Sequence, residues 1–232
     1  MTTTTIDTAR AIIAEARAKG AKSLSEYDSK QVLAAHGVPV TTEQTAQTAA
    51  EAVEAAAAIG YPVAVKGNAA DLAHKTEAGL VEIGLADADA VTAAADRLLA
   101  KLPKGGNLLV QEMAGGKREF LLGMTRDAQY GPCVTFGLGG IFAEALHDTV
   151  LRLAPVSERD ALEMMGEIRA AALLGAYRGM PEPDRKALAR AISGVGAAAL
   201  AHPEIAEIDV NPVIIAGDRP VAVDALVVLK SD

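Results

Sequence analysis

The chain has 232 residues, of which 50% are hydrophobic and 22% are charged, a composition typical of a globular protein with an ample core. This length exceeds one average domain without demanding two independent ones, so we expect one unit with two lobes. The net charge of −8 argues against non-specific binding to nucleic acid or to an anionic membrane. Any phosphate must therefore be bound by local cations, backbone amides or a metal ion.

Cys133 is the only cysteine, which excludes an internal disulfide and a cysteine-based zinc site. It lies in the apolar run 131–136, where a buried small side chain is its expected role. The first 20 residues lack the charged leader and apolar core of a signal peptide, and no stretch reaches about 18 uninterrupted apolar residues. We expect a soluble, cytoplasmic protein with no nucleic-acid or membrane partner.

Helix-capping residues mark several helix starts. Ser25 is followed three residues later by Asp28, a pattern in which side chain and backbone cap a helix start. Gly37 then offers the left-handed conformation that commonly ends a helix. The expected helices cover residues 5–19, 25–37, 48–60, 87–101, a segment opened by Ser157, and 183–201.

Short runs rich in β-branched residues predict strands. The expected strands are 62–65, 80–85, 108–113, 118–125, 132–137, 205–210, 213–215 and 221–229. Glycine-containing turns join the runs 108–113, 118–125 and 132–137, which predicts an antiparallel meander. The turn at 103–107 is the clearest candidate for a lobe boundary. These elements predict an α+β fold with strands in both lobes.

The strand 62–65 runs directly into Lys66, and the polar loop after it carries His74 and Lys75. A lysine that emerges from a buried strand is unusual unless an anion meets it. The alternative is a surface lysine with a buried aliphatic stem, and His74 by itself could equally be a structural imidazole.

A cluster of glycines follows the predicted strand 132–137. Gly137, Gly139 and Gly140 lie within four residues and leave backbone amides accessible to phosphate oxygens. A tight turn between strands is the alternative interpretation.

Acidic and amide side chains gather near the end of the chain. Glu207, Asp209 and Asn211 alternate, so on a strand they share one face. Asp224 interrupts the apolar run 221–229, which is costly inside a sheet unless the carboxylate is paired or bound to a cation. A hairpin would bring Asn211 beside Asp224, and such oxygen ligands suit Mg²⁺, which takes further ligands from phosphates. A structural hydrogen-bond network is the alternative.

The segment Gln111, Glu112 and Met113 ends an apolar strand where the lobes would meet, and Glu119 follows shortly after. Adenine is commonly held at such a junction by backbone groups, with a carboxylate near the ribose.

Four blocks of this sequence together resemble the ATP-grasp domain of the ADP-forming acyl-CoA synthetases, relatives of the succinyl-CoA synthetase β subunit. In the order of that family, they are LSEYDSKQVLAAHGVPV (24–40), PVAVKGNAADLAHKTEAGLV (62–81), FGLGGIFAEALHDTVLRLAPV (136–156) and EIDVNPV (207–213). The resemblance covers most of the chain and implies an ATP-grasp fold, in which two α+β lobes grip a nucleotide. We expect the lobes at residues 40–110 and at 1–39 plus 111–232.

The resemblance also implies roles for individual residues. Lys66 would contact ATP phosphate, and His74 occupies the place of a proposed phosphoryl acceptor. In this loop the chain has Asn68-Ala69-Ala70-Asp71 where the family commonly has a Ser-Pro-Asp run. The implied nucleotide contacts are Gln111, Glu112, Met113, Glu119, Gly139 and Gly140, and the implied Mg²⁺ ligands are Asn211 and Asp224 with Asp209 close by.

No segment resembles a CoA-binding domain or the domain that carries the main phosphohistidine of this family. The family reaction is acyl-CoA + ADP + phosphate ⇌ carboxylate + CoA + ATP. The resemblance therefore implies an α subunit that brings CoA, the small carboxylate and the mobile histidine, in an assembly such as a heterotetramer. By itself the chain is expected to bind ATP or ADP and Mg²⁺ without completing the reaction.

Two other functions remain open from the sequence. A stand-alone ATP-grasp ligase would form an acyl phosphate directly and would not need His74. A regulatory ATP-grasp domain would only sense nucleotide, although the intact site residues count against a degenerate sensor. The three other histidines are expected to be structural or surface residues, namely His36, His147 and His202.

Overall fold

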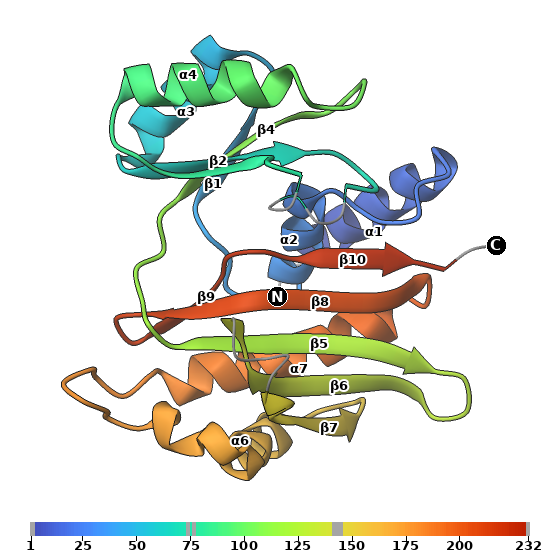
Figure 1. Cartoon of the computed structure of the whole chain (residues 1–232). Helices are drawn as coiled ribbons and strands as arrows, with labels where there is room; N and C mark the ends of the chain where they lie inside the picture. Colours follow the sequence, from blue (N-terminus) through green and yellow to red (C-terminus); the bar gives the residue numbers. More distant parts are fainter. Residues whose placement is uncertain (1–2, 73–74, 76–77, 141–145, 231–232) are drawn as a thin grey trace.

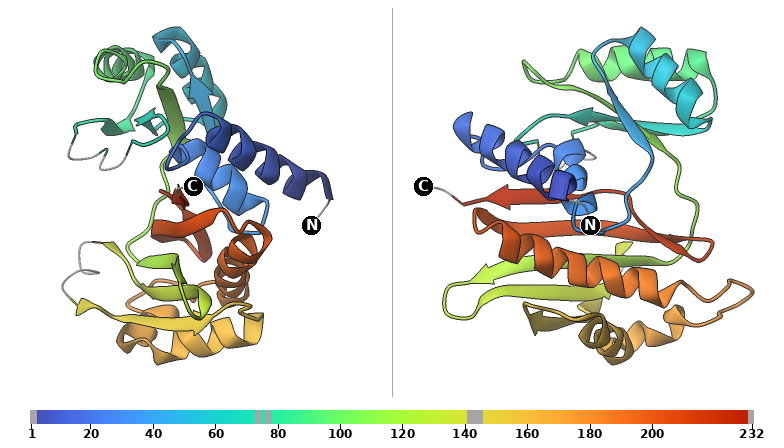
Figure 2. Two further views of the ribbon diagram at one scale, coloured as in Figure 1. Left: turned by 90° about the vertical axis from the view of Figure 1, so that its right-hand side faces the viewer. Right: turned by 180° about the vertical axis from the view of Figure 1, so that it is seen from behind.

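The computed structural model describes residues 3–72, 75, 78–140 and 146–230, and the statements below concern these residues. The chain forms two units, each a sheet with helices packed on one of its faces (Figure 1). The helices α1 and α2 lie between the two sheets at the back of the molecule (Figure 2). The fold is α+β, as the sequence predicts.

The first unit is a four-stranded sheet in the order β1-β4-β2-β3, with α3 and α4 on one face. Small side chains bring α3 close, because Ala52, Ala55 and Ala56 are its buried residues. With Val91 and Leu98 of α4 they form a separate hydrophobic core. The elements are β1 (Glu43–Ala46), α3 (Ala49–Ile59), β2 (Val63–Asn68), β3 (Val81–Leu85), α4 (Ala88–Leu99) and β4 (Asn107–Glu112).

The second unit is an antiparallel sheet in the order β10-β8-β5-β6-β7, and β9 pairs with β8. The strands are β5 (Glu119–Asp127), β6 (Gly131–Leu138), β7 (Thr149–Leu153), β8 (Ile205–Ala216), β9 (Arg219–Ala222) and β10 (Leu226–Leu229). The helical elements are α1 (Thr3–Ala18), α2 (Glu26–Ala34), α6 (Glu158–Glu167), η2 (Arg169–Leu174) and α7 (Arg185–Ala201).

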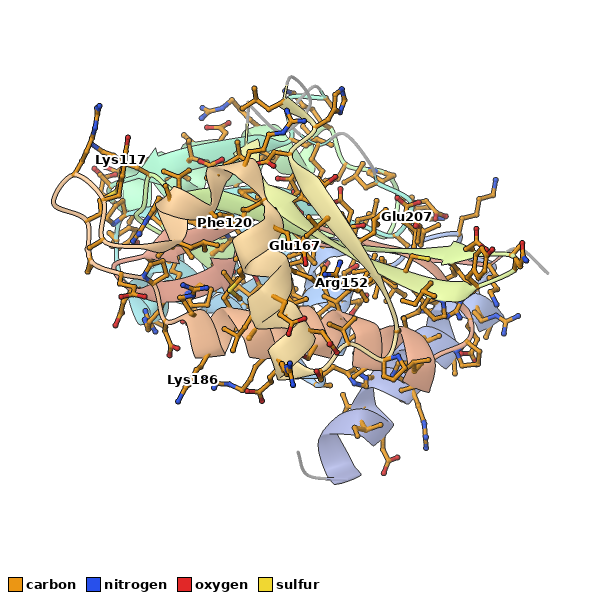
Figure 3. The ribbon with its side chains drawn as sticks, turned by 90° about the horizontal axis from the view of Figure 1, so that it is seen from below. Lys117, Phe120, Arg152, Glu167, Lys186 and Glu207 are labelled. Atoms are coloured by element: carbon orange, nitrogen blue, oxygen red, sulfur yellow. The ribbon has the colours of Figure 1, made fainter. Side chains whose placement is uncertain are left out.

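The helices α6 and α7 cover the rear face of the second sheet (Figure 2). Phe120 of β5 and Phe136 of β6 stack in its core with ring centroids 5.6 Å apart. At the outer strand, Arg152 of β7 forms an ion pair with Glu167 of α6 (Figure 3). Among the described residues, no helix has both the length and the apolar character needed to cross a membrane.

The predicted helices are confirmed, but the predicted meander is wrong in its first strand. The strand β4 pairs with β1 and β2 in the first sheet, whereas β5 and β6 belong to the second. Its buried residues Leu108 and Val110 pack into the core beneath α3 and α4. The connection 113–118 therefore crosses between sheets, and the turn at 103–107 joins α4 to β4 inside the first unit.

Four further features of the sheets differ from the prediction. The strands β1 and β7 were not expected, since β1 is short and mostly polar. The runs 205–210 and 213–215 form one continuous strand, β8, while the run 221–229 is divided into β9 and β10 at residues 223–225. This division places Asp224 outside the regular strand pairing.

A buried arginine holds the start of β5 in place. The two terminal nitrogens of Arg118 donate to four backbone oxygens, at 3.2 Å to Leu173 and Gly175, 2.7 Å to Pro181 and 3.3 Å to Gly217. These carbonyls supply the partial negative charge that a buried guanidinium needs. The crossing segment is thereby fixed to η2 and to the turn between β8 and β9.

Two buried histidines connect α2 to the end of α7. The Nε2 atoms of His36 and His202 lie 3.0 Å apart, and only glycine fits at Gly194, where a Cβ would lie 2.4 Å from the His36 carbonyl oxygen. Burial and the neighbouring His202 lower the pKa of His36 to about 4. Burial also lowers the pKa of His202, against the carboxylate of Glu204 and with a small contribution from Arg10.

We predict that this pair makes the protein sensitive to mild acid. Because the folded pKa lies below the unfolded one, the unfolded chain binds more protons between pH 6.5 and 4, so the stability of the fold decreases as the pH is lowered through this range. Chemical denaturation should show a loss of about 2 kcal/mol between pH 7 and pH 5. His36→Gln should flatten this dependence, and an equally steep profile in the variant would contradict the assignment.

Candidate functional site

The described part of the site begins with a lysine on a buried strand. Lys66 lies in β2, between β3 and β4, and is 5% exposed. Its Nζ donates to Glu26 Oε1 at 2.7 Å and to the Val223 carbonyl oxygen at 3.0 Å. Burial lowers the pKa of Lys66, and the carboxylate of Glu26 opposes this effect. Lys66 is therefore a buried cation that reaches from the first sheet to the second unit.

Glu26 is the shared partner of three lysines. It is the first residue of α2, whose N-cap is Ser25, and its side chain is 1% exposed. Its Oε1 accepts from Lys66 and from Lys30 at 2.8 Å, and its Oε2 accepts from Lys75. Burial alone would raise the pKa of Glu26, but the three ammonium groups outweigh it and hold this pKa far below its usual range.

Lys30 connects Glu26 to the first sheet. Its Nζ is fully buried and donates to Glu43 Oε2 at 2.7 Å, Gln111 Oε1 at 2.8 Å and Thr41 Oγ1 at 3.3 Å. Burial raises the pKa of Glu43 in spite of this lysine. The side-chain oxygen of Gln111 is thus engaged in a buried hydrogen bond with Lys30.

Lys75 connects Glu26 to the acidic end of the chain. Its Nζ donates to Asp224 Oδ1 at 3.0 Å as well as to Glu26. Burial disfavours its charge, but these two carboxylates together raise its pKa. Asp71 of the same loop is fixed, because its Oδ1 accepts from the Ser23 backbone amide at 2.7 Å. His74, the expected phosphoryl acceptor, lies outside the described residues.

The acidic residues lie where β8 faces the segment between β9 and β10. Asp209 pairs with Leu226 and Val213 with Ala222, so the register sets Asn211 opposite Asp224. Asp209 is exposed at the surface of β8, and its pKa is raised by partial desolvation of its carboxylate by surrounding atoms and by the carboxylates of Glu207 and Asp224.

These residues have the chemistry of a Mg²⁺ site. The carboxylates of Glu207 and Asp224 lie near enough to Asp209 to contribute, after desolvation, to its raised pKa, and a cation among these groups would relieve their mutual repulsion. Within the described ranges, no three His, Cys, Asp or Glu side chains form a metal-binding group. Asp209, Asp224 and Asn211 supply two carboxylates and an amide. This incomplete set of protein ligands fits a Mg²⁺ ion that takes its remaining ligands from water and phosphate, as this ion commonly does.

The glycine loop lies against the same strands. A Cβ at Gly139 would lie 2.6 Å from the backbone of Phe120, and one at Gly140 would lie 2.1 Å from Glu119 Oε2. Gly140 also has a φ of +68°, and its amide lies 3.5 Å from Asn211 Oδ1. The loop therefore brings a backbone amide next to Glu119 and Asn211, and close packing requires its glycines.

Two other expected nucleotide contacts lie at the crossing between the sheets. The Oε1 atom of Glu112 accepts from the backbone amide of Thr42 at 2.8 Å. Met113 is 40% exposed at the start of the crossing segment. Neither side chain has a described contact with Lys66. Glu112 and Met113 therefore form a part of the site separate from the one around Lys66.

Glu26 and Lys30 are the residues that sequence reasoning missed. Both lie in the block 24–40, which was interpreted only as a helix with a capping pattern. A glutamate and a lysine four residues apart on a helix are usually a surface pair. The signal that distinguishes them is their place among the apolar residues Leu24, Val32 and Leu33, which are buried.

The comparisons with known proteins agree with this geometry. A family model described as an ATP-grasp domain matches residues 15–229. The β subunit of the ADP-forming acetate–CoA ligase I of Pyrococcus furiosus is 39% identical over 227 residues, which cover 95% of this chain and 97% of that protein. The chain belongs to the ATP-grasp family of ADP-forming acyl-CoA synthetase β subunits.

Two further relatives show how this ATP-grasp domain occurs. A solved acetyl-coenzyme A synthetase 1 of Ca. Korarchaeum cryptofilum has a TM-score of 0.85 and 36% identity, with 96% of this chain and 100% of that chain covered. It is described as a complex with coenzyme A and Mg-AMPPCP, its phosphohistidine segment pointing towards the nucleotide binding site. In the ADP-forming acetate–CoA ligase I of Archaeoglobus fulgidus, 36% identical, the match covers 87% of this chain but 30% of that protein.

We predict that Gly139→Ala damages the ATP-grasp domain through steric conflict. The added methyl group would meet the backbone of Phe120, which cannot move without disturbing β5, so we expect a loss of about 1–3 kcal/mol of stability. Gly115→Ala is the matched control, because no atom lies within 4 Å of its added Cβ. Equal denaturation midpoints for the two variants would contradict this prediction.

Proposed function

We propose that this chain is the nucleotide-binding phosphotransfer subunit of an ADP-forming acyl-CoA synthetase. The observation that carries the proposal is the position of Lys66, whose Nζ lies against residue 223, next to Asp224 and Asn211. A buried cation beside oxygen ligands is the arrangement that phosphoryl transfer requires, since catalysis depends on positioning and charge neutralisation.

Within this proposal, the residues divide the work of holding Mg-ATP or Mg-ADP. Lys66 binds phosphate, and the backbone amides at Gly139 and Gly140 approach phosphate oxygens. Asn211 and Asp224, with Asp209, hold Mg²⁺, which neutralises the charge on the transferring group when bound. Gln111, Glu112 and Met113 line the adenine end, and Glu119 is a further nucleotide contact. This division is supported by the convergence of the glycine loop, Asn211 and Asp224 on one edge of the second sheet.

The reaction step that we assign to this chain is exchange of a phosphoryl group between ATP and a histidine. An imidazole nitrogen attacks the γ-phosphorus, a P–N bond forms, the P–O bond to ADP breaks, and ADP leaves. His74 is the acceptor we propose on this chain, because it directly precedes Lys75, which is anchored to Glu26 and Asp224.

The rest of the reaction is assigned to a partner α subunit that carries the CoA-binding domain and a mobile phosphohistidine. The match covers only 30% of the Archaeoglobus relative, which supports an enzyme that contains further domains beside this one. CoA and the small carboxylate would bind through that subunit. We propose two copies of each chain in a heterotetramer, in the cytoplasm, where ATP, ADP and CoA are available.

A stand-alone acyl-phosphate-forming ligase and a regulatory nucleotide sensor remain the competing functions. The first would turn over without a partner, and the second would bind nucleotide without transferring phosphate. Both would bind nucleotide as the proposal does, and the labelling and turnover experiment below separates them from it.

We predict that the isolated chain binds ADP in the presence of Mg²⁺ and that two substitutions weaken this binding. Lys66→Ala removes a phosphate cation and Asp224→Asn removes a metal carboxylate, so calorimetry should show losses of roughly tenfold or more in affinity. Lys19→Ala is the control, because that lysine forms an exposed pair with Glu15. Wild-type affinity in both site variants would refute the assigned site.

We predict that [γ-³²P]ATP labels the chain at His74. The label should be stable in base and labile in acid, as a phosphoimidazole is, and His74→Asn should abolish it while His147→Asn retains it. Acyl-CoA synthesis should require addition of the α subunit. Turnover by the isolated chain would instead favour the stand-alone ligase, and binding without label would favour the sensor.

A further inference from the structure

One carboxylate in the network has more partners than its own charge can balance. Glu26 accepts from Lys66, Lys30 and Lys75, and none of these side chains is more than 11% exposed. A buried charge is costly unless it is paired, so this sharing has to be explained. In the proposed function Glu26 serves only as an anchor of Lys75.

Two of the three lysines pair with a second carboxylate besides Glu26. Lys30 pairs with Glu43 at 2.7 Å, and Lys75 pairs with Asp224 at 3.0 Å. Lys66 alone among the three has Glu26 as its only described carboxylate, and its other acceptor is the Val223 carbonyl oxygen. The three ammonium groups and the three carboxylates of the network thus balance formally.

This arrangement allows Lys66 to change partners at low cost. If Lys66 turns to a phosphate, Glu26 still has Lys30 and Lys75, so no buried carboxylate is left without a cation. Removing the sole partner of a buried charge would instead leave that charge uncompensated, which is strongly destabilising. Lys30 and Lys75 therefore keep Glu26 in place both when Lys66 pairs with it and when Lys66 binds a phosphate.

Glu26 also joins the two parts of the site. Through Lys66 it is linked to the Val223 carbonyl, and through Lys75 to Asp224, which is the next residue. One rigid carboxylate at the start of a capped helix thus sets the place of both lysines relative to the 223–224 segment. The positions of a phosphate cation and of a metal carboxylate then depend on the same side chain.

We propose that Glu26 is the positioning residue for phosphoryl transfer: it holds Lys66 in reach of the nucleotide phosphates and, through Lys75, aligns it with Asp224. It releases Lys66 to the nucleotide and touches neither phosphate nor metal itself. This inference rests on the proposed function and adds a residue to it.

The test is Glu26→Gln, with Glu43→Gln as the matched control. Both remove a buried carboxylate that pairs with Lys30, but Glu43 has no described contact with Lys66 or Lys75. In the first readout, calorimetry on the full chain compares the Kd values of AMP and ADP with Mg²⁺. Because the competitor of the phosphates for Lys66 is gone, the ratio of AMP to ADP Kd should rise roughly tenfold in Glu26→Gln. It should stay within about twofold in Glu43→Gln.

The second readout is turnover by the chain assembled with its α subunit. Glu26→Gln should lower kcat by about 10–100-fold without raising the KM for nucleotide, because Lys66 binds phosphate but is no longer aligned. A merely structural defect would raise the KM for nucleotide and would weaken the binding of AMP and of ADP to the same extent. That outcome, an unchanged ratio, or the same changes in Glu43→Gln would overturn the proposal.

Glu26→Asp keeps the test decisive if Glu26→Gln does not fold. It retains the buried charge and shortens its reach by one methylene, so smaller changes in the same directions are expected; wild-type values would overturn the proposal. Failure of the wild-type chain to bind Mg-ADP would contradict the proposed function itself. Wild-type binding that is weakened by Lys66→Ala, with no effect of either Glu26 variant, would overturn only the role of Glu26.

Discussion

The burial of charge between the two sheets is the constraint on which this structure depends. Glu26 and the three lysines that pair with it can be buried only because each has a partner of opposite charge at hydrogen-bond distance. These partners come from α2, β2, the loop after β2 and the segment after β9. The sheets and helices therefore have to meet in one arrangement for the network to be satisfied, and this arrangement brings Lys66 beside Asp224.

Close backbone approach is the second constraint, and it acts at the glycine loop. Gly139 packs directly on the backbone of Phe120, and Gly140 packs on the carboxylate of Glu119. Phe120 is in turn fixed by its stacking on Phe136 in the core. The accessible amides of the loop are thus anchored to the most buried part of the second sheet.

The helices could be predicted because the signals that start and end them are local. Caps such as Ser157 with Asp160 lie within one turn, and that capping box is present in the structure. The sheet to which β4 belongs could not be predicted, since pairing with β2 depends on residues about 40 positions away. Glu26 was missed for the same reason: its partners Lys66 and Lys75 lie far along the chain.

The position of α2 also has a consequence for how the chain folds. This helix is near the N-terminus, yet Ser29 Oγ accepts from the Val227 amide at 3.1 Å and the Leu24 amide donates to the Val227 carbonyl oxygen at 3.0 Å. The helix α2 and the strand β10, which are about 190 residues apart in the sequence, are thus packed together. Contacts of such long sequence separation form slowly, because a large loop must close before they contribute. During synthesis, the hydrogen bonds that anchor α2 to Val227 can form only after residue 227 has left the ribosome, so α2 is made long before the strand on which it packs.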